Sequence, residues 1–191
     1  RVVSVCLTNG ENEIIMANKG GRAIRFNENT VRTMGRTATG VRGMMLDDDQ
    51  GIDAVVGMVC INDPEKETIM VVSQQGYGKR SDIEDYRKTN RGGKGVKTLN
   101  ITEKTGSLVA IKAVTDEHDL MIINHSGIAI RLRVADVRVM GRATQGVRLI
   151  NLGRRGDTIG SVCQVNTEIE TDESEIKETE NYAPETVEEQ V

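Results

Sequence analysis

Gly35-Arg36-Thr37-Ala38-Thr39-Gly40-Val41-Arg42 is the stretch of sequence that decides the fold, because it recurs. Gly141-Arg142-Ala143-Thr144-Gln145-Gly146-Val147-Arg148 repeats it closely. Asn90-Arg91-Gly92-Gly93-Lys94-Gly95-Val96-Lys97 is a more divergent copy, about fifty residues from each of the others. A fixed period of this length is the signature of a repeat architecture. Each copy is rich in glycine and carries two or three cations, which predicts an exposed loop that can approach a polyanion closely.

Short β-prone segments flank each copy of the loop. In the first repeat, Ile14–Ala17 is followed by turn residues and then by Arg22–Phe26, where apolar and charged side chains alternate. Val41–Leu46 and Asp53–Cys60 follow the loop, which gives about four short strands, the content of one propeller blade. We therefore predict an all-β, propeller-like protein of about three four-stranded blades, in repeats near 14–66, 69–116 and 120–165.

Three blades are too few to close a propeller ring, which typically has four to eight. The chain also opens on Arg1 in the middle of a β-like run. We therefore expect residues 1–13 to be the end of a preceding blade, and the chain to be the carboxyl-terminal part of a longer protein.

The charge of the chain is unevenly distributed around a net value of −4. Residues 166–191 contain ten acidic side chains and one cation, so residues 1–165 keep 24 Lys and Arg against 19 Asp and Glu. A basic body with an acidic tail is typical of nucleic-acid contact with a built-in competitor, although a merely solubilising tail has the same composition. High charge without periodicity predicts that residues 166–191 are disordered.

The three cysteines share one position of the repeat. Cys6, Cys60 and Cys163 are aligned, and the second repeat has Ala113 there. An odd number of cysteines argues against a disulfide framework. A position that accepts Cys or Ala predicts a small buried core site.

The sequence lacks the residue patterns of a zinc site, a phosphate loop or a membrane span. No pair of His or Cys has the spacing of a zinc site, and His118 and His125 lie at predicted turns. The glycine-rich segment 76–80 does not fit a phosphate loop. The longest apolar runs are too short to cross a bilayer. We predict no catalytic residue, no metal site, no cofactor in this segment and no membrane contact.

Cations recur at matched positions of the repeats, and in a ring of blades such positions fall on one edge. Phosphate contact without base reading needs Arg and Lys together with glycines that permit close approach. Binding of single strands would need stacking aromatic residues, which make up 2% of the chain. We therefore predict a rim for duplex DNA formed by Arg25, Arg36, Arg42, Lys79, Arg80, Arg91, Lys94, Lys97, Arg131, Arg142 and Arg148.

Three segments of the chain resemble the carboxyl-terminal domain of the DNA gyrase A subunit: Arg22–Phe26, Val31–Gly43 and Val137–Arg148. The resemblance extends over residues 1–165. It implies a β-pinwheel of about six blades that wraps double-stranded DNA around its edge. It also implies a bacterial, cytoplasmic, nucleoid-associated type II topoisomerase in which two A and two B subunits use ATP and Mg²⁺ to introduce negative supercoils. Thr89–Gly95 is similar to the family's Gln-Arg-Arg-Gly-Gly-Arg-Gly box but lacks the leading Gln-Arg, so the box and the catalytic tyrosine are expected upstream.

Two alternatives remain open at this point. The homologous subunit of topoisomerase IV has a similar ring of blades that binds DNA without strong wrapping. A propeller-type protein-interaction scaffold would need exposed aromatic or aliphatic anchors, which this aromatic-poor chain offers sparsely.

Overall fold

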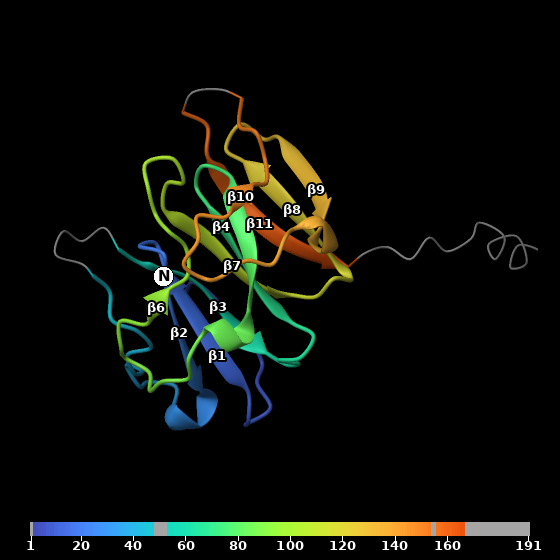
Figure 1. Ribbon diagram of the computed structural model, residues 1–191. Helices are drawn as coiled ribbons and strands as arrows, with labels where there is room; N and C mark the ends of the chain where they lie inside the picture. The colour runs from blue at the N-terminus through green and yellow to red at the C-terminus, as the bar shows by residue number, and fades with distance from the viewer. Residues whose placement is uncertain (1, 48–52, 154–155, 167–191) are drawn as a thin grey trace, which may run out of the picture.

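Antiparallel sheets make up the structure, a computed structural model that describes residues 2–47, 53–153 and 156–166 (Figure 1). The first sheet contains β3 (Val55–Ile61), β1 (Glu13–Asn18), β2 (Arg22–Asn27) and β6 (Val96–Lys97) in that order. The second contains β10 (Val147–Arg148), β5 (Tyr77–Asp82), β4 (Thr68–Ser73) and β7 (Leu108–Val114). The third contains β11 (Ile159–Asn166), β8 (His118–Asn124) and β9 (Ala129–Arg133). Short 3-10 helices follow the strands β2, β5 and β9: η1 (Glu28–Thr30), η2 (Ile83–Asp85) and η3 (Val134–Asp136).

The predicted all-β, propeller-like architecture is confirmed, but its blades are not continuous in sequence. β6 belongs to the second repeat, yet it pairs with β2 of the first sheet, with Ala23 opposite Val96. β10 belongs to the third repeat and pairs with β5 of the second sheet, with Gly78 opposite Val147. The fourth strand of each of these sheets is therefore supplied by the following repeat. The expectation that each repeat builds its own four strands is wrong in this respect.

Glycine makes this exchange of strands possible. Gly95 and Gly146 precede β6 and β10 and have φ values of +69° and +78°. A β-carbon at these positions would lie 2.2 Å from the Ala23 carbonyl oxygen and 2.5 Å from that of Gly78, respectively. Only a residue without a side chain lets the two backbones come this close. Gly40, at the same position of the first repeat, has φ +86°, but a β-carbon there would have no described atom within 4 Å. The segment Val41–Leu46 forms no strand.

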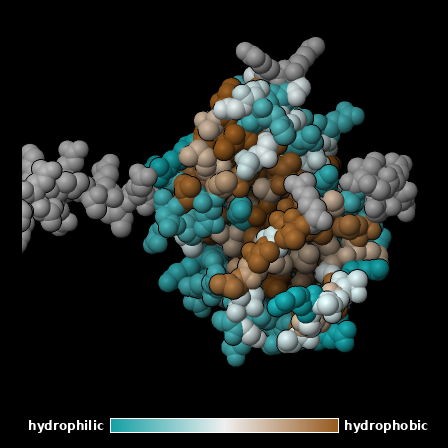
Figure 2. All heavy atoms as spheres, turned by 180° about the vertical axis from the view of Figure 1, so that it is seen from behind, coloured by the Kyte–Doolittle hydropathy of each residue, from teal (hydrophilic) through white to brown (hydrophobic). Residues whose placement is uncertain are grey.

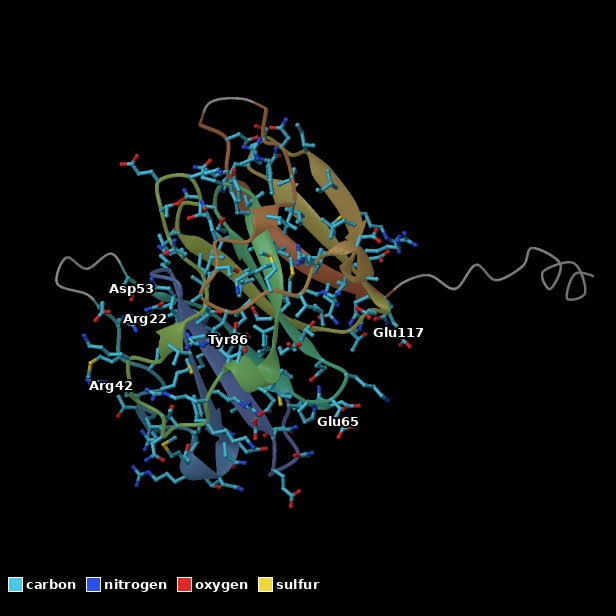
Figure 3. All side chains as sticks on the ribbon, viewed as in Figure 1. Arg22, Arg42, Asp53, Glu65, Tyr86 and Glu117 are labelled. Carbon is cyan, nitrogen blue, oxygen red and sulfur yellow. The ribbon has the colours of Figure 1, made fainter. Side chains whose placement is uncertain are left out.

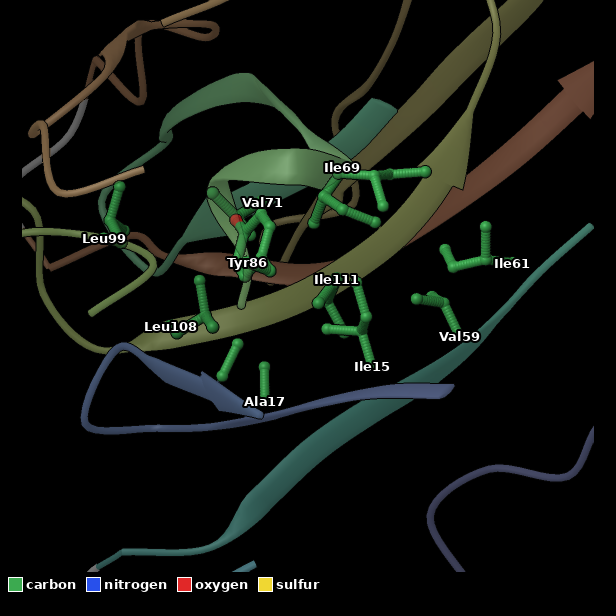
Figure 4. Close-up of a cluster of buried hydrophobic side chains, with 12 residues drawn as sticks. Ile15, Ala17, Val59, Ile61, Ile69, Val71, Tyr86, Leu99, Leu108 and Ile111 are labelled. Atoms are coloured by element: carbon green, nitrogen blue, oxygen red, sulfur yellow. The ribbon is translucent and has the colours of Figure 1, made fainter. Parts of the chain in front are cut away.

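The first and second sheets are covered on both faces, which explains the continuous apolar runs of their central strands. In β1, Ile15 and Ala17 face the second sheet in a cluster with Tyr86 (Figure 4). Ile14 packs on the opposite face with Phe26. β4 is buried on both faces, since Ile69 and Val71 join the first of these clusters and Met70 and Val72 contact the third sheet. Full burial of each such side chain contributes about 1.5–3 kcal/mol.

The sheets meet along one edge and diverge toward the other. β7 packs against both β3 and β11, and a β-carbon at Gly57 of β3 would lie 3.0 Å from a methyl group of Ile111 in β7. β6 and β10 occupy the opposite edges of their sheets. The exchanged strands, and the glycine-rich loops that lead into them, therefore form an outer edge that crosses from sheet to sheet (Figure 1).

The amino-terminal segment covers part of the outer face of the first sheet. The Ser4 hydroxyl donates to the Met58 carbonyl at 3.3 Å, and the apolar side chains of Val2, Val5 and Leu7 remain exposed. Apolar atoms gather in the middle of the rear face of the molecule (Figure 2). The assignment of residues 1–13 to a preceding blade stays a prediction. No helix of the described ranges is long and apolar enough to span a membrane.

The expectation for the three cysteines is wrong. Cys163 is exposed and Cys6 and Cys60 are half-buried, so the shared position is not a core site. The reason is that Val162, next to Cys163 in β11, faces the core, which turns the cysteine to the outer face of the third sheet. Asn166 is the last residue of β11, and the rest of the acidic tail predicted to be disordered lies outside the described residues.

The strand exchange predicts unequal effects of the same substitution at Gly40 and Gly95. Gly40→Ala should lower the free energy of unfolding by about 1–2 kcal/mol, because only the positive φ is strained. Gly95→Ala should cost about 1–3 kcal/mol more, because its methyl group also meets the Ala23 carbonyl. Urea unfolding followed by circular dichroism measures both values. Equal losses would contradict the proposed role of the close approach.

Candidate nucleic-acid interface

Seven of the predicted DNA-binding residues lie along the outer edge, on the glycine-rich loops and the exchanged strands. Arg36, Arg42, Lys94, Lys97 and Arg148 are exposed, and Arg91 and Arg142 are half-buried. We call this set the cationic edge: Arg36, Arg42, Arg91, Lys94, Lys97, Arg142 and Arg148.

Backbone contacts between successive loops make the cationic edge continuous. The Arg91 guanidinium donates to the Arg42 carbonyl at 3.2 Å and to the Thr30 carbonyl at 3.0 Å. In the next repeat, the Arg142 guanidinium donates in the same way to the Lys97 carbonyl at 2.9 Å. Arg91 and Arg142 therefore each lie against the backbone of the preceding loop, and the cations of successive repeats are neighbours.

Few carboxylates lie close to the cationic edge. Asp47 accepts from Lys94 at 2.8 Å and pairs with Arg22 at 3.5 Å, and the Lys94 hydrogen bond lowers the pKa of this carboxyl. Exposed ion pairs of this kind are weak, so a phosphate can replace the carboxylate at little cost. Arg22 and Arg42 lie on one side of the molecule, and the acidic turns that carry Glu65 and Glu117 lie on the other (Figure 3).

Arg25 was predicted to face DNA, but its side chain is only 2% exposed. Its Nε donates to Glu13 at 2.5 Å, and its NH1 donates to the carbonyls of Ile83 and Tyr86 at 2.9 and 3.0 Å. Although burial alone raises the pKa of Glu13, hydrogen bonds from Lys88 and Arg25 lower it below the usual value. Arg25 therefore joins the first sheet to η2 of the second and is not available for phosphate contact.

Arg80 and Lys79 are buried as well. Arg80 repeats the role of Arg25 one sheet further on, since its Nε donates to the Val137 carbonyl at 2.7 Å and its guanidinium pairs with Asp116. Lys79 is fully buried and donates to the Ser81 hydroxyl at 2.7 Å and to the Gly141 carbonyl at 3.0 Å. The sequence prediction failed at Arg25 and Arg80 because it took their faces of β2 and β5 as solvent-exposed, whereas the next repeat covers those faces. Lys79 points to the opposite face of β5, and there it is buried against the loop that contains Gly141.

Arg131 occupies the position of the third repeat that matches Arg25 and Arg80, but the outer face of its sheet is more open. Arg131 in β9 is exposed and pairs with Asp119 at 2.6 Å. Its contact with phosphate stays a prediction.

Sequence reasoning missed an aromatic component of the interface. Tyr77 lies directly opposite Arg148 in the β5–β10 pair, and the Arg148 guanidinium donates to its hydroxyl at 3.1 Å. The Lys104 ammonium lies 5.3 Å from the centre of the Tyr77 ring. Tyr77 has no aromatic equivalent in the other repeats, which have Arg22 and Ile128 at this position, so the periodicity gave no signal for it.

Repeated antiparallel sheets, exchanged strands and a cationic outer edge define a protein of the β-propeller class with a surface suited to a polyanion. The sequence model of the family described as "DNA gyrase C-terminal domain, beta-propeller" matches residues 12–62, 67–115 and 118–162. The chain belongs to this family.

Individual relatives agree with this assignment. The DNA gyrase A subunit of Staphylococcus aureus strain NCTC 8325 is 44% identical over 174 residues, which are 91% of this chain and 19% of that relative. The chain thus spans about a fifth of that protein. Among solved structures, the carboxyl-terminal domain of DNA topoisomerase IV superposes with a TM-score of 0.78 at 26% identity, covering 86% of this chain and 50% of the other. A DNA gyrase A carboxyl-terminal domain gives 0.72 at 27% identity, with 81% and 50% covered.

The burial of Arg25 predicts that its loss affects stability rather than DNA. Arg25→Gln should lower the free energy of unfolding by about 3–5 kcal/mol, because Glu13 and two carbonyls lose a buried partner. Arg36→Gln, an exposed control, should change it by less than about 0.5 kcal/mol. Urea unfolding tests both. An Arg25→Gln variant of normal stability with weakened DNA binding would return Arg25 to the cationic edge.

Lys79 predicts a specific dependence of stability on pH. Burial lowers its pKa from the ordinary 10.5 to about 8, against the opposing effect of Asp85. Between these values the unfolded chain holds the proton and the folded chain does not, so stability rises with pH across the window from about 8 to 10.5. The free energy of unfolding of the wild type, measured relative to Lys79→Met, should increase across it by on the order of 1–3 kcal/mol. A difference that stays constant between pH 7 and pH 10 would contradict the pKa assignment.

Proposed function

We propose that this chain is the DNA-binding and DNA-wrapping part of a DNA gyrase A subunit, and that duplex DNA bends around the cationic edge. The observation that carries the proposal is the contact between successive loops, from Arg91 to the Arg42 backbone and from Arg142 to the Lys97 backbone. A duplex that follows the outer edge would meet a cluster of cations at each repeat without leaving the surface.

The chemistry of the edge favours phosphate recognition. Arginine donates in a planar fork that matches phosphate oxygens, and the loop glycines admit a polymer backbone closely. Smoothly bending a site of 20–30 bp costs of order 1–6 kcal/mol, so several phosphate contacts must act together. The proposal therefore requires cooperation between repeats and no base-specific contact.

The holoenzyme supplies the rest of the activity in this proposal. The Staphylococcus aureus relative described above is a subunit of DNA gyrase, and the chain covers 19% of it. We infer a type II topoisomerase in the bacterial cytoplasm, associated with the nucleoid, in which two copies each of the A and B subunits use ATP and Mg²⁺ for negative supercoiling. Catalytic residues and these cofactors belong to other parts of that assembly.

Charge reversal at the equivalent loop arginines tests the proposal. The variant Arg36→Glu, Arg91→Glu, Arg142→Glu should abolish bending of a doubly labelled duplex in a fluorescence-transfer assay. The slope of log affinity against log salt should fall by about 0.9 for each lost phosphate contact. Unchanged bending would reject the edge as the DNA path.

A matched pair of single variants separates location from net charge. Arg36→Glu lies on the cationic edge, whereas Lys66→Glu changes an exposed cation in the turn beside Glu65 on the other side of the molecule. Arg36→Glu should weaken duplex binding and Lys66→Glu should not. Binding with an intact salt slope but without bending would instead favour the weakly wrapping behaviour expected of a topoisomerase IV domain.

A further inference from the structure

A surface cavity of about 280 Å³ opens beside β10, at the outer end of the second sheet. Tyr77, Lys104, Arg148, Gln75 and Asn151 supply its polar lining, and none of the described residues that line it is a carboxylate. Liquid water occupies about 30 Å³ per molecule, so the cavity has room for a phosphate group together with several waters. Two cations and neutral hydrogen-bond donors select for an anion.

The side chains of this cavity are arranged around the phenol of Tyr77. The Arg148 guanidinium carbon lies 5.6 Å and the Lys104 ammonium 5.3 Å from the ring centre, within the range of cation–π attraction. Because Arg148 donates to the Tyr77 oxygen at 3.1 Å, the phenol proton is left to donate elsewhere. The Arg148 hydrogen bond also lowers the pKa of Tyr77, which makes the phenol a stronger donor.

The matching place in the first sheet has a different charge balance. There Arg22 lies opposite Lys97, as Tyr77 lies opposite Arg148 in the second sheet. The cavity beside Arg22 contains Asp47 and Asp53, and Asp47 pairs with Arg22 at 3.5 Å. Its cations are therefore already compensated by carboxylates, whereas no carboxylate of the described ranges lines the cavity beside Tyr77.

We propose that Tyr77, Lys104 and Arg148 form a binding site for a single phosphate group. Lys104 and Arg148 supply the charge, and the Tyr77 hydroxyl donates a hydrogen bond between them. Since Arg148 belongs to the cationic edge, the phosphate belongs to the backbone of bound duplex DNA, and this part of the inference rests on the proposed function. A free phosphate or the phosphate of a nucleotide shares the same chemistry.

Carbon-13 NMR of the tyrosine ring tests the site directly. The chain has three tyrosines, and Tyr77→Phe assigns the resonance of Tyr77. Titration with inorganic phosphate at constant ionic strength, and separately with a short duplex, should shift this resonance in a saturable manner. The resonance of Tyr86 should stay fixed, because its hydroxyl is buried against Thr98 at 2.6 Å. Arg148→Gln and Lys104→Gln should abolish the phosphate response, whereas Lys66→Gln, an exposed cation in the turn beside Glu65, should preserve it.

Duplex affinity gives the second measurement. Tyr77→Phe should weaken duplex binding about 2- to 10-fold, as expected for one lost hydrogen bond. Lys104→Gln should lower the logarithmic salt slope by about 0.9. Two results together would overturn the site and leave the proposed function standing. They are unchanged duplex affinity of both variants, and a Tyr77 resonance of the wild type that the duplex does not shift. Saturable binding of phosphate without any duplex binding would support the site for free phosphate and reject the proposed function.

Discussion

The close approach of a glycine to the backbone of a neighbouring sheet is the constraint on which the rest of this structure depends. At Gly95 and Gly146 the chain passes so near the carbonyls of Ala23 and Gly78 that a β-carbon has no room. The hydrogen bonds then continue, for example from Thr98 to the Gly21 carbonyl at 2.8 Å. Because the same loops carry the arginines, one feature of the backbone both links the sheets and aligns their cations on the outer edge.

Burial divides the repeated cations into two groups with different roles. Arginines in the strands, such as Arg25 and Arg80, are enclosed between sheets and hold the 3-10 turn of the following repeat through its carbonyls. Arginines in the loops, such as Arg36 and Arg42, remain exposed. A buried guanidinium is costly to desolvate, and its carbonyl and carboxylate partners compensate for that cost. Positive charge therefore stabilises the junctions between sheets in one group and remains available for a polyanion in the other.

Periodicity made the fold and the loop cations predictable from the sequence, because short-range patterns report local structure. The apolar segments around Ile15, Val71 and Ile122 became the central strands, as expected. Long-range pairing was not predictable, since nothing in Val96-Lys97 specifies which sheet this two-residue strand joins. The same gap explains the error at Arg25 and Arg80. Alternation identifies the two faces of a strand, but it does not reveal that a later repeat covers the second face. Tyr77 was missed because an aromatic residue that occurs in one repeat only leaves no periodic signal.

The offset between sequence repeats and sheets gives the array a direction. The second repeat supplies the last strand of the first sheet, and the third repeat supplies the last strand of the second sheet. A whole unit inserted between two others would keep every joint intact, whereas excision at the apparent sequence boundaries would remove a strand that the adjacent unit needs. Each inserted unit would also add one loop to the outer contour. The number of units would then set the length of duplex that can follow the outer edge, while the strand pairing between units stays the same.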